Sequence, residues 1–127
     1  MASITGEAFF RQQIRCLEAG DIAGLMGQYH EDAVLLTFGA VVRGRVAIGE
    51  FLRDYLGHLG AFTLTSTDRF VDSGDAVFVE ATVSSDLGEA RVYDAFVLRD
   101  GKATHHFAGV IASANGSRAD AGARGPV

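Results

Sequence analysis

Two residues near the C-terminal end of the chain, Asp94 and His106, have the side chains needed for proton transfer. They flank Arg99-Asp100-Gly101-Lys102, which joins two apolar, β-branched-rich runs in a pattern typical of a β-hairpin. If the hairpin brings them together, Asp94 would orient the imidazole and leave its second nitrogen free to act as a general base. The pair could instead be buried, mutually hydrogen-bonded, and important only for fixing the strand register.

The length of the hairpin loop decides whether these side chains meet, because side chains alternate between the two faces of a sheet. A three-residue loop, with Gly101 in the left-handed conformation, pairs Leu98 with Lys102 and sets Asp94 opposite His106. The resulting inward face would consist of Val92, Asp94, Phe96, Leu98, Thr104, His106, Ala108 and Val110.

The alternative is a two-residue loop formed by Asp100-Gly101. That loop would pair Arg99 with Lys102, turn His106 to the outer face and bring His105 inward. We expect the three-residue loop, because it avoids placing two cations opposite each other, a preference of about 0.2 to 1 kcal/mol.

The other candidate site residues are bulky side chains expected around an apolar ligand cavity. Tyr29 and Tyr55 could each bring a hydroxyl into the cavity from the second and third helices, although such tyrosines are more often core residues. The expected substrate-binding residues are Tyr29, Phe38, Phe51, Tyr55, Phe96 and Val110.

The remaining titratable residues are expected to have structural roles. His105 should face outward, and His30 and His58 are expected at helix ends, where the helix dipole favours a cation. The sequence has no His-x-His or Glu-x-x-His spacing and no Gly-rich phosphate loop, so we expect neither a metal nor a cofactor. The single Cys16 excludes an internal disulfide.

Composition limits the class of protein. The chain has 127 residues, of which 48% are hydrophobic and 21% are charged, which fits one globular domain. The net charge of -5 disfavours nucleic-acid and anionic-membrane partners. No secretory signal or membrane-length apolar run is recognisable in the sequence, so we expect a cytoplasmic protein.

Hydrophobic periodicity predicts helices followed by long strands. The expected helices cover residues 6–18, the stretch from Asp21 to Asp32, and residues 45–59; the expected strands cover 34–38, 41–42, 62–71, 77–84 and the hairpin 90–111. This order predicts an α+β fold, in which three N-terminal helices pack on the concave face of a cone-shaped, curved antiparallel sheet. We expect one domain over residues 1–112 and a loose tail over 113–127.

Four stretches resemble the nuclear transport factor 2 superfamily, and within it the SnoaL-like polyketide cyclases and ketosteroid isomerase-like proteins. They are Leu17–Leu25, Tyr29–Val34, Gly44–Phe51 and Tyr93–Lys102. The resemblance implies the cone-shaped fold, usually as a homodimer formed through the outer face of the sheet. Members of the superfamily include isomerases, dehydratases, cyclases, epoxide hydrolases and non-catalytic binding domains.

The resemblance carries over only one of three catalytic positions of the ketosteroid isomerases. Thr37 matches their Asp base, Gln13 matches their oxyanion-binding Tyr, and Asp94 matches their protonated Asp, a residue whose neutral form is a known feature of those enzymes. A neighbouring His106 would instead favour an ionised Asp94. Steroid-type enone isomerisation is therefore not implied.

Together these features predict a cofactor-independent enzyme that transfers protons in a small hydrophobic molecule of the polyketide-like kind. The reaction would be isomerisation, cyclisation or dehydration, with epoxide opening less favoured. The alternative is a ligand-binding or dimerisation module of the same fold that carries out no chemistry. In either case we expect a homodimer through Tyr93, Val97 and Phe107, which would otherwise leave an apolar patch in water.

Overall fold

The computed structural model describes residues 5–37 and 39–113. In chain order the elements are α1 (Gly6–Ala19), α2 (Ile22–Met26), β1 (Tyr29–Thr37), β2 (Ala40–Arg43), α3 (Arg45–Leu59), β3 (Thr63–Asp72), β4 (Ala76–Ser85), β5 (Gly88–Arg99) and β6 (Lys102–Ser113). Apart from Ser113, which ends β6, the predicted tail lies outside the described residues, and so does Phe38. No helix in the described part of the chain is both long and apolar enough to cross a membrane.

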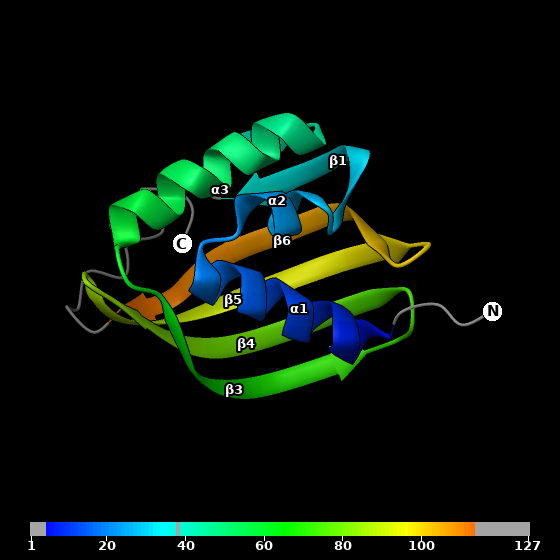
Figure 1. Ribbon diagram of the computed structural model, residues 1–127. Coiled ribbons are helices and arrows are strands. Elements are labelled where there is room, and N and C mark those ends of the chain that lie inside the picture. The colour runs from blue at the N-terminus through cyan, green and yellow to red at the C-terminus, as the bar shows by residue number, and fades with distance from the viewer. Residues whose placement is uncertain (1–4, 38, 114–127) are drawn as a thin grey trace.

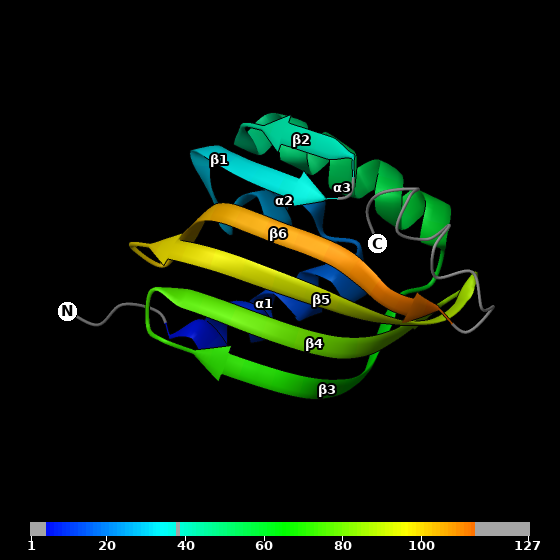
Figure 2. The same ribbon diagram turned by 180° about the vertical axis from the view of Figure 1, so that it is seen from behind.

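The strands form one curved sheet in the order β2-β1-β6-β5-β4-β3. The helices cover one face of this sheet (Figure 1), and its opposite face carries no helix from the described ranges (Figure 2). The predicted α+β class is confirmed. One detail differs: β1 and β6 pair in parallel. α3 follows the β1–β2 hairpin, in the order of the predicted ranges.

Local signals set the bounds of the helices. The Thr5 hydroxyl accepts a hydrogen bond from the Ala8 amide, and Gly20 ends α1 in the left-handed conformation, as the sequence predicts. The predicted second helix was too long, because α2 ends at Met26. The carbonyl of Gln28 already accepts a hydrogen bond from the Ala103 amide of β6, so the chain from residue 29 onward extends the sheet instead of the helix.

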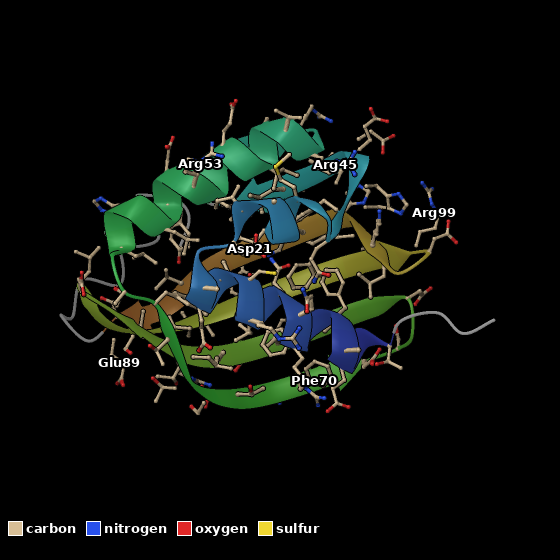
Figure 3. The ribbon with its side chains drawn as sticks, viewed as in Figure 1. Asp21, Arg45, Arg53, Phe70, Glu89 and Arg99 are labelled. Atoms are coloured by element: carbon tan, nitrogen blue, oxygen red, sulfur yellow. The ribbon has the colours of Figure 1, made fainter. Side chains whose placement is uncertain are left out.

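The predicted three-residue hairpin loop is wrong. Asp100 and Gly101 both have positive φ, 55° and 78°, and Arg99 pairs with Lys102, which is the two-residue turn that Asp-Gly favours. Both cationic side chains are exposed, and Arg99 lies at the outer end of the hairpin (Figure 3). Water screens the repulsion between such exposed charges, so it does not outweigh the preference of the turn.

A β-bulge nevertheless keeps His106 on the inner face. Leu98 pairs with Ala103, but Val97 pairs with His105, so Thr104 is an extra residue on β6. The Thr104 hydroxyl donates to the carbonyl of Val97 at 3.2 Å. The extra residue reverses the effect of the shorter loop on β6 as far as Val110, where the pairing with β5 shifts again.

Two glycines near the end of α3 should respond oppositely to an added methyl group. Gly60 has φ +77° and ψ −133°, and a Cβ there would overlap the Asp86 carboxylate, so Gly60→Ala should lower the free energy of unfolding by about 2 kcal/mol. Gly57 is an exposed helical position with open space around it, so Gly57→Ala should raise that free energy by about 0.5 to 1 kcal/mol. Urea unfolding measures both changes, and equal effects would contradict the assigned backbone of Gly60.

Candidate active site between the helices and the sheet

A cavity of about 60 Å³ lies between the helices and the concave face of the sheet. Its walls come from α1, α3 and five of the strands. The lining residues are Phe10, Gln13, Ile14, Leu17, Leu35, Thr37, Phe51, Leu52, Tyr55, Phe62, Leu64, Ala81, Val83, Val92, Asp94, Phe96, His106 and Ala108. Asp94 is the only acidic residue among them, so one carboxylate faces an otherwise largely apolar space.

The structure brings together some, but not all, of the predicted substrate-binding residues. Phe51, Tyr55 and Phe96 line the cavity. Tyr29 does not: it begins β1 instead of ending a helix, and it is completely buried beneath the cavity wall. Val110 lies further along β6 and packs against the hydrophobic core, while Ala108 of the same strand takes the predicted place on the wall.

Asp94 and His106 are in direct contact, as the sequence predicts. His106 Nε2 lies 2.7 Å from Asp94 Oδ1, with 6% of the histidine side chain and 27% of the aspartate side chain exposed. The two residues are diagonal neighbours, because His106 pairs with Phe96 and Asp94 pairs with Ala108. The imidazole also stacks on the Phe96 ring, with a centroid separation of 4.1 Å, so the ring is held in one orientation.

The predicted role of His106 as the free base does not fit the geometry. Its second ring nitrogen, Nδ1, lies 2.9 Å from the Tyr29 hydroxyl, so both nitrogens are already engaged. Asp94 Oδ2, in contrast, has no hydrogen-bond partner within the described ranges. The carboxylate, not the imidazole, therefore has a free position from which to accept a proton.

Two buried glutamines extend this pair into the core. The Gln13 amide donates to the Tyr29 hydroxyl at 3.1 Å, and Gln28 contacts both Gln13 and the carbonyl of Phe9. Sequence reasoning noted Gln13 only as a family match and missed Gln28. The sequence did carry one signal: Gln13 falls among the apolar residues on the buried side of α1, and a buried amide needs hydrogen-bond partners.

Two hydroxyl groups on the cavity wall have no hydrogen-bond partner among the described residues. They belong to Tyr55 and to Thr37, whose Oγ1 is itself buried. Burial, and then the negative charge of Asp94, raise the pKa of Tyr55, and burial likewise raises the pKa of Tyr29. Both phenols therefore remain protonated at neutral pH, and Tyr55 can donate a hydrogen bond into the cavity.

The other histidines lie away from the cavity. His30 is in β1, not at a helix end, and its Nε2 donates to the carbonyl of Arg99 at 2.6 Å. His105 faces outward, where its ring stacks on Phe107, and His58 is in the last turn of α3. In residues 5–37 and 39–113 no three His, Cys, Asp or Glu side chains are close enough to hold a metal ion.

Solved structures share this fold. A candidate polyketide cyclase from Sinorhizobium meliloti is 20% identical over 79% of this chain and 92% of its own, with a TM-score of 0.70. An epoxide hydrolase of M. tuberculosis is 22% identical over 84% of each chain, with a TM-score of 0.69. A nuclear transport factor 2-like protein from Anabaena variabilis is 18% identical over 82% of this chain and 84% of its own, with a TM-score of 0.73.

These identities show a common fold and do not identify a reaction. A search of curated protein sequences gave no match. The sequence model of one family, the SnoaL-like domain, matches residues 10–106. These residues include Asp94, His106 and nearly all of the cavity wall. The chain therefore belongs to the SnoaL-like domain family and has the nuclear transport factor 2-like fold.

Proposed function

We propose that the protein is a cofactor-independent enzyme that moves a proton within a small hydrophobic molecule bearing a carbonyl or hydroxyl oxygen. The observation that carries this proposal is the position of Asp94. Among the described residues it is the one acidic side chain on the cavity wall. One of its oxygens is held by His106, and the other has no hydrogen-bond partner in residues 5–37 and 39–113. A fixed carboxylate in an apolar cavity suits general base catalysis.

In the proposed reaction, Asp94 Oδ2 removes a proton from the carbon next to the substrate carbonyl. The electron pair of that C–H bond moves onto the carbonyl oxygen, where the hydroxyl of Tyr55 donates a hydrogen bond to the developing negative charge. Return of the proton from Asp94 to another carbon completes an isomerisation. In a cyclisation the carbanion attacks a second carbonyl, and the alkoxide that forms takes the proton back from Asp94. In a dehydration the hydroxyl on the next carbon takes that proton as its C–O bond breaks, and it leaves as water.

The cavity favours a small substrate. Its volume of about 60 Å³ is below the roughly 150 Å³ that accommodates benzene in an engineered cavity. A ring can therefore bind only if half-buried wall residues such as Phe51 and Phe62 move. We therefore favour a monocyclic substrate over a polycyclic one.

The proposal is tested by exchange of carbon-bound hydrogen with solvent deuterium. The protein is incubated in deuterium oxide with a panel of small cyclic ketones and enones, and deuterium next to the carbonyl is followed by proton NMR. Accelerated exchange supports the enzyme. A ketone that binds, as shown by calorimetry, but exchanges at the uncatalysed rate supports the alternative of a binding module with the same fold.

We also propose that a second copy of this chain covers the outer face of the sheet. Val97 and Phe107 are 39% and 38% exposed there. Tyr93 lies half-buried on the same face of β5, four residues before Val97. No described helix covers this face of the sheet (Figure 2). Apolar side chains gathered on a bare sheet face are typical of an interface.

Val97→Glu should therefore convert a dimer into a monomer in sedimentation velocity, because the charge would have to be buried in the interface. The matched control is Val46→Glu, a more exposed valine on α3, which should leave the dimer intact. A dimer that persists in Val97→Glu would place the interface elsewhere.

A further inference from the structure

A continuous chain of hydrogen bonds, which we call the relay, runs from a backbone carbonyl in α1 to the candidate base. In order, its members are Phe9, Gln28, Gln13, Tyr29, His106 and Asp94. The links come from α1, β1, β5, β6 and the segment before β1, so elements far apart in the sequence meet in one polar path. All of its links before Asp94 are buried. The direction of each hydrogen bond can therefore be worked out from the fixed end.

The fixed end is the carbonyl oxygen of Phe9, which can only accept a hydrogen bond. The Gln28 atom that faces it at 2.9 Å must therefore be the donor Nε2. That same Nε2 lies 3.3 Å from one terminal atom of Gln13, which must be the acceptor Oε1. The other terminal atom of Gln13, its Nε2, consequently faces the Tyr29 hydroxyl at 3.1 Å and donates to it.

This orientation determines the protonation of the imidazole. The Tyr29 oxygen already accepts from Gln13, so its own proton is available for His106 Nδ1, 2.9 Å away. A ring nitrogen that accepts a hydrogen bond carries no proton of its own; we call such a nitrogen bare. The imidazole must then carry its proton on Nε2, which donates to Asp94 Oδ1 at 2.7 Å.

A doubly protonated His106 does not fit the same path. Its Nδ1–H would point at the Tyr29 oxygen, which already receives the Gln13 amide, and the phenol proton of Tyr29 would lose its acceptor. Tyr29 is completely buried, and an unsatisfied donor in such a place is costly. The relay therefore stabilises the neutral ring.

We propose that Gln28 is a positioning residue, which sets the direction of the relay and so keeps His106 neutral with its proton on Nε2. Gln28 does not line the cavity; it acts through Gln13 and Tyr29. Its consequence for the site is that Asp94 Oδ1 always receives a hydrogen bond while Oδ2 stays free. This inference concerns the resting protein and holds whether or not the cavity catalyses a reaction.

The first test is the ¹⁵N NMR spectrum of the histidine rings at pH 7.5 without any added ligand. Single Gln replacements of the other three histidines assign the signals of His106. We expect Nε2 of His106 at the position of a protonated nitrogen and Nδ1 at that of a bare nitrogen. A protonated Nδ1 in the wild-type protein would overturn the proposal.

The second test reverses the relay with Gln28→Glu. A carboxylate at this position cannot donate, so Gln13 should turn its Nε2 toward residue 28 and its Oε1 toward Tyr29. Tyr29 would then donate to Gln13, and His106 would have to donate from Nδ1. The Nδ1 signal should therefore move from the bare to the protonated position.

The matched control is Gln12→Glu, because Gln12 contacts Cys16 and Arg15 rather than the relay. The His106 signals of this variant should be the same as in the wild-type protein. If Gln28→Glu fails to fold, Gln13→Glu replaces it, since a carboxylate there accepts from Tyr29 and produces the same shift. A folded variant of either kind with Nδ1 still bare would overturn the assigned role of Gln28.

Discussion

Asp94→Asn should slow the deuterium exchange of a bound ketone by roughly 10²- to 10⁴-fold and change the dissociation constant of that ketone by no more than a few-fold. Asn has almost the shape of Asp, and its carbonyl oxygen can still accept the hydrogen bond from His106 Nε2 that Asp94 Oδ1 accepts now. The cavity and the relay therefore remain, and only the oxygen that could take a proton is lost. Exchange is followed by proton NMR, and binding by calorimetry.

The matched control for this substitution is Asp54→Asn. Asp54 is exposed on α3, one residue before Tyr55, so its replacement removes the same charge without touching the cavity wall. Its exchange rate should equal that of the wild-type protein. If Asp94→Asn also exchanged at the wild-type rate, the base would have to be another group.

Tyr29→Phe should lower the free energy of unfolding by about 2 to 4 kcal/mol, although it removes a single oxygen atom. The loss leaves the Gln13 amide and His106 Nδ1 without their partner at a completely buried position, and each unsatisfied buried group costs about 1 to 3 kcal/mol. Urea unfolding monitored by circular dichroism measures the change.

Tyr93→Phe is the corresponding control. Tyr93 is half-buried on the outer face of the sheet and has no side-chain hydrogen bond to the described residues, so its loss should change the free energy of unfolding by less than about 0.5 kcal/mol. Equal effects of the two substitutions would show that the phenol of Tyr29 is not a stabilising part of the relay.

The sequence predicted those elements whose signals are local. The bounds of α3 follow from a regular apolar stripe between two glycines, and they agree with the structure. The second helix was extended wrongly because Ile22, Leu25 and Tyr29 also have helical spacing. Residue 29 joins a strand only because β6, more than seventy residues later, is there to pair with it, and no local pattern reveals such a partner.

The candidate site was predictable to the same extent. The contact of Asp94 with His106 was predicted correctly, but from the wrong loop. The bulge at Thr104 depends on a balance between turn preference and strand pairing. A charge repulsion of about 0.2 to 1 kcal/mol is too small to decide that balance. Which nitrogen of His106 is free depends on Tyr29, Gln13 and Gln28. These three residues become neighbours only in the folded chain.

Because of the bulge at Thr104, the number of residues in β6 does not by itself decide which of them face the cavity. Because Thr104 pairs with no residue of β5, the pairs on either side of it, Leu98 with Ala103 and Val97 with His105, would be the same in a chain that lacked it. Loss of this one residue would therefore leave the pairing with β5, and with it the inward position of His106, unchanged. Gain of a pairing partner for Thr104, in contrast, would shift the strand by one position and exchange His106 for His105 in the cavity wall.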